Sequence, residues 1–149
     1  MKEVRFNAPK PSFYDEYLSN FSRSDLVYEG VSYPTVEHAY QAQKTLSQIE
    51  RIRIAGLETP GKAKKAGRDV DLREDWEDVK FQVMVDLLRL KFRIPLYREA
   101  LMSTEDSEII EDASGWNDTV WGVGRAGSGQ NLLGKALMKI REEIREGEE

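Results

Sequence analysis

Apolar residues recur with helical spacing between residues 76 and 90, and this stripe constrains the fold more than any other feature of the chain. Trp76, Val79, Val83, Leu87 and Leu90 follow one another at intervals of three or four residues, which places them on one face of an α-helix. We therefore expect the longest helix over residues 72–92, with the stripe buried as the central core element.

Shorter elements are expected on both sides of this helix. Helices are predicted from about Thr35 to residue 44 and over residues 47–55, 60–66, 96–102 and 130–145. The second of these should turn Ile49, Ile52 and Ile54 inward. A short strand near residue 6, a hairpin around Glu29-Gly30 and a strand over residues 108–111 complete the set.

The balance of elements indicates an α+β fold that is mostly helical with a small β component. A length of 149 residues fits one compact domain over residues 1–149, with a single core. No internal repeat and no Pro-, Gly- or Ser-rich linker divides the chain.

Composition limits the classes of function. The sequence has no cysteine and one histidine, so disulfides, a thiolate nucleophile and an ordinary zinc site are excluded, and we expect no cofactor. The formal net charge of −5 argues against nucleic-acid binding through bulk charge. No apolar run approaches the ~20 residues of a membrane span, and the start lacks a signal-peptide stretch. We expect a cytoplasmic protein that makes no membrane contact.

Residues 33–44 combine a helix start with reactive side chains. Thr35 can cap the helix, and Glu37, Gln41 and Lys44 then share one face at positions i, i+4 and i+7. An acid, an amide and an amine on one face suit a catalytic site. The alternative is that Glu37 and Lys44 are solvated charges on an exposed face, with His38 a packing residue.

Residues 115–131 form a second candidate site, with two tryptophans and five glycines directly before the last expected helix. Glycines let backbone approach a ligand, and amides at a helix start attract phosphate. The alternative is a flexible turn with a packed tryptophan, in which Asp118 only shapes the turn. Gly122, Gly124 and Gly127 have dinucleotide-fingerprint spacing, but no β-α-β unit surrounds them, so we reject that interpretation.

The chain resembles the NADAR, or YbiA-like, superfamily over nearly its whole length. Three blocks carry the resemblance, and they occur in the family's order. They are Phe13-Tyr14-Asp15, Leu18-Ser19-Asn20-Phe21, Thr35-Val36-Glu37-His38 and Tyr40-Gln41-Ala42-Gln43-Lys44; then Gly67-Arg68-Asp69, Trp76-Glu77, Val79-Lys80 and Met84; then Asn117-Asp118, Trp121-Gly122, Gly124, Gly127, Asn131, Leu133-Gly134, Leu137-Met138 and Arg141.

This resemblance implies a compact α+β domain that hydrolyses N-glycosidic bonds of phosphorylated ribosides. The implied substrates are phosphoribosylaminopyrimidines of riboflavin synthesis or ADP-ribose attached to guanine, including guanine in nucleic acid. Glu37 would be the acid/base carboxylate, Lys44 the amine near the anomeric carbon, with a transient Schiff base, and Asp118 a third catalytic group. The implied substrate-binding residues are Asn20, Phe21, Gln41, Arg68, Trp76, Trp121, Gly122, Gly124 and Asn131.

One position departs from the family pattern. Relatives often carry an acidic residue between the two closing glycines, where this chain has Val123. The departure leaves open a non-catalytic sensor of ADP-ribose or NAD that uses the same pocket. A third alternative is an interaction module built on the acidic residues 142–149.

Overall fold

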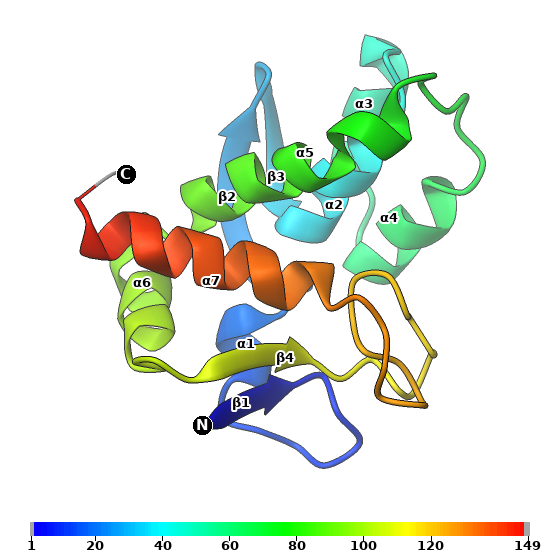
Figure 1. Cartoon of the computed structure of the whole chain (residues 1–149). Helices are drawn as coiled ribbons and strands as arrows, with labels where there is room; N and C mark the ends of the chain where they lie inside the picture. The colour runs from blue at the N-terminus through cyan, green and yellow to red at the C-terminus, as the bar shows by residue number, and fades with distance from the viewer. Residues whose placement is uncertain (1, 148–149) are drawn as a thin grey trace. The chain divides into compact units, whose positions relative to one another are not determined.

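The computed structural model describes residues 2–147 and has an α+β architecture (Figure 1). In chain order the elements are β1 (Glu3–Phe6), α1 (Asp15–Leu18), β2 (Arg23–Tyr28), β3 (Val31–Thr35), α2 (Val36–Ala42), α3 (Gln48–Ala55), α4 (Pro60–Ala66), α5 (Trp76–Lys91), α6 (Pro95–Met102), β4 (Glu108–Glu111) and α7 (Leu132–Arg145). Helices predominate and the strands are short, so the predicted fold class is confirmed.

The chain divides into two compact units. The middle unit comprises residues 20–91, and the terminal unit comprises residues 1–19 together with 92–149. The prediction that residues 1–149 form one domain stays a prediction, and each unit is described by itself below.

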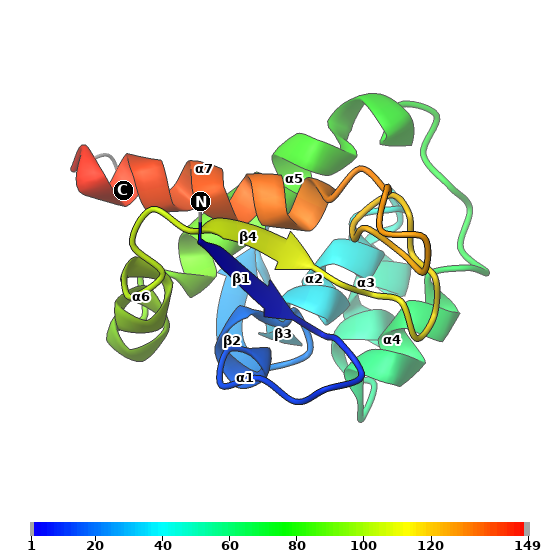
Figure 2. The same ribbon diagram turned by 60° about the horizontal axis from the view of Figure 1, so that its bottom comes forward.

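In the terminal unit, the first strand pairs in parallel with a strand about a hundred residues later in the sequence. β1 pairs with β4 in the register Glu3↔Glu108 through Phe6↔Glu111, and α7 runs along β4 (Figure 2). α7 is amphipathic and buries Leu133, Leu137 and Ile140, because these residues recur with helical spacing. The predicted strand over residues 108–111 and the last helix are therefore confirmed.

In the middle unit, a hairpin leads directly into the helix that organises the unit. β2 and β3 are antiparallel, and Glu29 and Gly30 both adopt positive φ angles between them, the geometry of the turn that best matches strand twist. α2 follows β3 without a break and contacts β2, β3, α3, α4 and α5. Every residue of α2 is buried, so it forms the core of this unit.

Two expectations for the middle unit are wrong. α5 begins at Trp76 and not near residue 72, because the Arg73 amide donates to the carbonyl of Lys44 and holds residues 71–73 in irregular backbone. Ile49 and Ile52 are 81% and 57% exposed, whereas Ile54 is fully buried. α3 therefore contacts α2 along a narrower face than the sequence pattern indicated.

Candidate functional site

The start of α2 is fixed by its capping residue. Thr35 ends β3 with an extended backbone, and its Oγ1 accepts a hydrogen bond from the His38 amide at 3.0 Å. This is the usual N-cap, in which a side chain pairs with an amide that has no partner within the helix. His38 Nδ1 lies 2.8 Å from the same hydroxyl, and Nε2 lies 2.9 Å from the Leu57 carbonyl. Burial lowers the pKa of His38. The histidine therefore ties α2 to the end of α3, in agreement with a packing role.

Glu37 and Gln41 form a buried pair one helical turn apart. Gln41 Nε2 donates a hydrogen bond to Glu37 Oε2 at 2.6 Å. Glu37 is 8% exposed and Gln41 is 4% exposed. A buried carboxylate requires hydrogen-bond partners. The amide of Glu37 also donates to the Asn20 carbonyl at 3.1 Å, so the segment before β2 is held against the start of α2.

Lys44 lies just beyond the end of α2, and its amine turns back along the helix. Its Nζ lies 5.8 Å from the centre of the Tyr40 ring. Burial lowers the pKa of Lys44, the Glu37 carboxylate raises it, and the cations of Arg68, Lys64 and Lys80 lower it further. The net direction is downward, because the effect of burial is the largest. Glu37 and Lys44 are thus close enough to influence each other, and the amine is shifted toward its neutral, nucleophilic form.

The cations around Lys44 form a basic cluster, which we define as Lys44, Lys64, Arg68 and Lys80. Lys64 lies on α4, Arg68 follows that helix, and Lys80 lies on α5, where it forms an ion pair of 2.7 Å with Glu77. Several positive charges at one place attract an anion such as phosphate although the whole chain is negative. Arg68 is among the binding residues that the resemblance implied, whereas Lys80 was missed as a member of the site. Lys80 follows Trp76 by four residues, so the two share one face of the helix, and this spacing could have indicated that Lys80 belongs to the site.

Aromatic and amide side chains border the same helix. Tyr40 and Trp76 are in ring contact, with centroids 5.1 Å apart, and Trp76 is only 4% exposed. Asn20 is buried, its Nδ2 lies 3.6 Å from the sulfur of Met84, and its Oδ1 has no hydrogen-bond partner among the described residues. Phe21 is exposed. Trp76 is therefore largely a packing residue, whereas Asn20 offers an unsatisfied acceptor.

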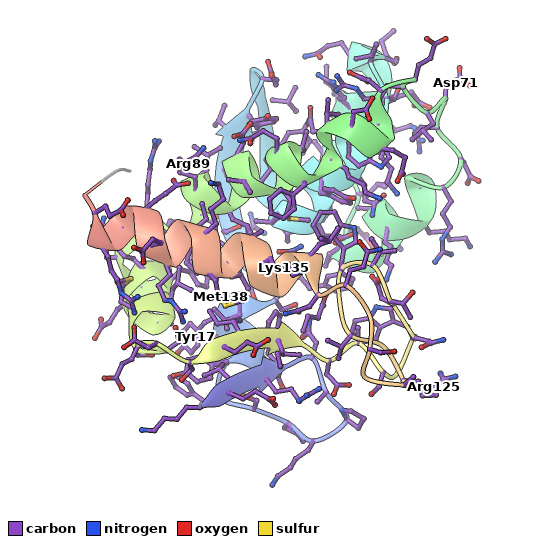
Figure 3. All side chains as sticks on the ribbon, in the orientation of Figure 1. Tyr17, Asp71, Arg89, Arg125, Lys135 and Met138 are labelled. Atoms are coloured by element: carbon purple, nitrogen blue, oxygen red, sulfur yellow. The ribbon has the colours of Figure 1, made fainter. Side chains whose placement is uncertain are left out.

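In the terminal unit, Asp118 shapes the glycine-rich loop. Its Oδ1 accepts hydrogen bonds from the amides of Val120 and Trp121, both at 2.9 Å, as aspartates at turns commonly do. Figure 3 shows Arg125 on this loop, where its amide donates to Asn117 Oδ1 at 2.8 Å. The arrangement gives Asp118 a structural role and leaves its catalytic role as a prediction.

The amides before and within the first turn of α7 are already used. Five successive backbone amides donate to carbonyls of the same loop at 2.8 to 3.1 Å: Gly129 to Val123, Gln130 to Thr119, Asn131 to Gly122, Leu132 to Val120 and Leu133 to Trp121. A phosphate held by these donors is therefore excluded, which corrects the expectation from the glycine pattern. The reason is that the loop folds back on itself and pairs its own backbone.

The glycines of this loop permit close backbone packing. A Cβ at Gly122 would lie 2.6 Å from the Cβ of Ala113, and Gly124 has a φ angle of +72°. Val123 between them is buried, with its amide bonded to the Glu111 carbonyl at 2.9 Å. The position where relatives often carry an acid is thus filled here by a core residue.

Asn131 is engaged by the neighbouring strand. Its backbone is left-handed, its Nδ2 donates to the Ile109 carbonyl at 2.9 Å, and its Oδ1 accepts from the Glu111 amide at 3.0 Å. The side chain therefore pairs with β4 as a further strand would. Both ends of the amide serve the fold, and ligand binding by Asn131 remains a prediction.

The described residues contain neither a candidate metal cluster nor a membrane-spanning helix. Among residues 2–147, no three His, Asp or Glu side chains are grouped so that they could hold a metal ion. Over the same residues, no helix has both the length and the apolar character needed to cross a bilayer.

Comparison with known proteins assigns a family. The model of the NADAR domain matches residues 6–145. N-glycosidase YbiA of Escherichia coli strain K12 is 39% identical over 135 residues, which cover 87% of this chain and 83% of the relative. An N-glycosidase of Nostoc punctiforme is 38% identical over 134 residues, with coverages of 86% and 85%.

A more distant relative and a solved structure agree with this assignment. A riboflavin biosynthesis protein of Vibrio vulnificus is 34% identical over 155 residues, where the match covers 97% of this chain and 41% of the longer protein. The NMR structure of the E. coli protein YbiA superposes with a TM-score of 0.84 at 35% identity and covers 99% of this chain and 88% of its own. The chain therefore belongs to the NADAR family.

Proposed function

We propose that the chain hydrolyses the N-glycosidic bond between a phosphorylated ribose, in ribose 5-phosphate or ADP-ribose, and a base or base-like amine. By its family the chain is an N-glycosyl hydrolase, so the proposal concerns the substrate and the residues that act on it. One observation carries it: burial lowers the pKa of the Lys44 amine while the Glu37 carboxylate acts on that amine from the preceding helix.

Lys44 is the nucleophile of the proposed reaction. Its neutral Nζ attacks C1 of the ribose, and the bond from C1 to the leaving nitrogen breaks. The electron pair departs with that nitrogen, which takes up a proton. The attached amine gives up one proton to that nitrogen and a second to the ring oxygen, whose bond to C1 breaks as the C1=N bond of the Schiff base forms. Water then hydrolyses the Schiff base to free sugar and free amine.

Glu37 supports the same step electrostatically. Departure of the base builds positive charge on the ribose around C1, and a carboxylate held nearby stabilises that charge. The hydrogen bond from Gln41 at 2.6 Å orients the carboxylate. A positioned acid or base of this kind contributes ~10²-fold or more to the rate.

The remaining predicted residues belong to substrate binding. In the middle unit, Arg68 presents an exposed guanidinium for a phosphate, and Asn20 offers a buried acceptor for a sugar hydroxyl. Phe21, Gln41 and Trp76 are proposed to contact the same ligand. In the terminal unit, the proposed substrate-binding residues are Trp121, Gly122, Gly124 and Asn131, and the proposed third catalytic residue is Asp118.

The partner implied is a small molecule of one of two classes. A phosphoribosylaminopyrimidine is favoured because two relatives are named riboflavin biosynthesis proteins. ADP-ribosyl-guanine, free or within a nucleic acid strand, is the other class. Both present an anionic phosphate to the basic cluster and an N-glycosidic carbon to Lys44.

The test is to incubate the protein with each substrate class and to measure release of the free base. We expect release from at least one class, loss of ~10²-fold or more in rate for Glu37→Gln, and near-complete loss for Lys44→Met. Glu50→Gln, an exposed carboxylate on α3, is the matched control. Borohydride treatment during turnover should fix the sugar to wild type and not to Lys44→Met. Inertness toward both classes, or full activity of Glu37→Gln, contradicts the proposal.

A second candidate function is a non-catalytic sensor of ADP-ribose or NAD. The observation that favours it is the buried Val123, where relatives often carry an acid. Calorimetry separates the two functions: tight binding of ADP-ribose without product after long incubation favours the sensor. Base release at any substrate concentration excludes it.

A further inference from the structure

Gly67 is a glycine without a conformational reason to be one. It ends α4 with φ −62° and ψ −19°, which is ordinary right-handed helical backbone that every residue adopts. An alanine in such a position normally stabilises a protein by ~0.4–1 kcal/mol, because it restricts the unfolded chain. The reason for the glycine must therefore be found in its surroundings.

Those surroundings are the side chain of Gln41. A Cβ added at Gly67 would lie 2.8 Å from Gln41 Cδ and closer still to Oε1, both inside the range that real Cβ atoms avoid. Gln41 Oε1 is buried and has no hydrogen-bond partner among the described residues. The Gln41 side-chain amide therefore lies against the bare backbone of Gly67. There, only weak C–H contacts can take the place of the hydrogen bond that its oxygen lacks.

The other end of the same amide holds the carboxylate of Glu37. Gln41 Nε2 donates to Glu37 Oε2 at 2.6 Å, so the amide spans the gap between Gly67 and Glu37. Rotation by 180° would turn its oxygen toward a carboxylate oxygen, which is repulsive. The amide thus has one orientation that satisfies Glu37, and that orientation requires the space that Gly67 leaves.

We propose that Gly67 is a positioning residue for catalysis, which acts on Glu37 through Gln41. This inference rests on the proposed function of Glu37. Gly67 contacts neither the substrate nor the reacting atoms; its absent side chain fixes the Gln41 amide, and the amide fixes the carboxylate. The role differs from that of a helix-terminating glycine, because the backbone at Gly67 has no need of one.

The variant Gly67→Ala tests this directly. Its methyl group displaces the Gln41 amide and breaks the hydrogen bond to Glu37, so we expect kcat to fall ~10- to 100-fold, the scale of a misplaced catalytic group. KM should change by a smaller factor than kcat, because the basic cluster is untouched and Gln41 is only one of several proposed ligand contacts. Gly56→Ala is the matched control: Gly56 ends α3 in the same unit with right-handed backbone, and its added Cβ would lie no closer than 3.7 Å to its neighbours.

A double-mutant cycle decides whether Gly67 acts through Gln41. Gln41→Ala removes the hydrogen bond together with Cδ and Oε1, the two nearest atoms that an alanine at 67 would meet, and leaves Cβ at 3.1 Å, where a shift of a few tenths of an ångström suffices. We therefore expect Gln41→Ala, Gly67→Ala and the double variant to share the same reduced kcat, with no further loss in the double. Independent multiplication of the two losses would overturn the inference.

Thermal melting of the same variants tests the contact even if Gly67→Ala folds poorly. If Gly67→Ala melts below wild type or fails to fold, the double variant should return close to the melting temperature of Gln41→Ala, because its two shortest contacts, to Cδ and Oε1 of Gln41, are gone. Failure to recover it contradicts the contact.

The outcomes also separate this inference from the function on which it rests. Wild-type inertness toward both substrate classes removes the proposed function and the positioning role with it. An active wild type whose Gly67→Ala variant keeps full kcat removes the positioning role alone.

Discussion

At the scale of single residues, the decisive property of Lys44 is its environment. The sequence placed a carboxylate near the amine, and a carboxylate alone would raise the pKa of Lys44. The structure adds burial and three neighbouring cations, and together these lower it. A neutral amine at moderate pH is a requirement for nucleophilic attack. The residue is therefore prepared for chemistry by its surroundings.

The first prediction concerns the pH dependence of the reaction. Because the pKa of Lys44 lies below its ordinary 10.5, kcat/KM should rise with pH as the amine loses its proton, with an inflection below that value. Lys80→Met removes a charge that lowers this pKa, so the inflection should move to higher pH. Rate profiles of kcat/KM between pH 6 and pH 10 (about the range in which the protein is expected to stay folded) measure both effects.

Lys62→Met is the control for this profile. Lys62 is exposed and pairs with Glu58, and it is not among the charges that act on Lys44. Its substitution should leave the inflection in place. A profile of Lys80→Met that coincides with wild type would contradict the electrostatic account.

The second prediction concerns Lys91, which is fully buried at the end of α5. Burial lowers its pKa to about 7 from 10.5. Below pH 7 the folded and unfolded chains both carry the proton, so the folded state bears the whole cost of the buried charge. Above it the folded amine is neutral, and the cost declines until the unfolded chain also loses its proton.

Wild type should therefore gain stability relative to Lys91→Met as the pH rises from 7 toward 10.5. The gain is at most ~1.4 kcal/mol per pH unit. Urea unfolding of both proteins across this range measures it. A stability difference that is independent of pH would refute the prediction.

At the scale of elements, helix ends and turns follow from local sequence, and packing faces do not. Thr35, Ser47 and Thr59 each cap a helix that begins within a residue or two of its predicted start, since capping depends on residues within one turn. The exposed face of α3 could not be predicted, because apolar residues also occur on surfaces. The packing of α3 against α2, β3 and α4 determines which isoleucine is buried.

The third prediction follows from that difference. Ile54→Ala should lower the free energy of unfolding by ~2–4 kcal/mol, because it leaves a cavity beside α2. Ile49→Ala and Ile52→Ala should change it by less than ~0.5 kcal/mol, as is usual for exposed positions. Chemical denaturation of the three variants provides the comparison. Equal losses for all three would mean that α3 packs as the sequence pattern indicated.

The candidate site shows the same limit of sequence reasoning. Glu37 and Gln41 lie on α2, and Lys44 follows two residues after its end rather than on the helix as expected, so their proximity could be predicted from spacing although the helix end could not. The use of the amides before α7 by carbonyls of residues 119–123 could not, because it depends on how a loop folds back on itself. The contact between Gly67 and Gln41 likewise joins segments that are far apart in sequence.

At the scale of the whole molecule, net charge and local charge have opposite signs. The chain carries a formal charge of −5, yet the basic cluster gathers cations from α4, α5 and the segments after α2 and α4. A negative protein repels an anionic substrate at long range, and a local cluster attracts it at short range. Salt screens charges beyond ~8–10 Å at physiological strength.

The fourth prediction is that added salt weakens binding of the phosphorylated substrate without slowing the chemistry. KM should rise by a factor of ~3–10 as NaCl increases from 50 mM to 500 mM, while kcat stays constant. Arg68→Gln should flatten this dependence. Lys65→Gln, exposed on α4 and outside the basic cluster, should not. A KM that is insensitive to salt in wild type would exclude a role for the cluster in binding.

The parallel pairing of β1 with β4 has a consequence for biosynthesis. A nascent polypeptide leaves the ribosome amino-terminus first, and Glu3 must wait for Glu108 before the two can pair. The whole of residues 20–91 emerges in the interval. Until residue 108 emerges, the segment of β1 lacks its partner strand and is open to wrong partners, and closure of so distant a contact is intrinsically slow. Chaperone protection of the amino-terminal strand is most valuable during that delay.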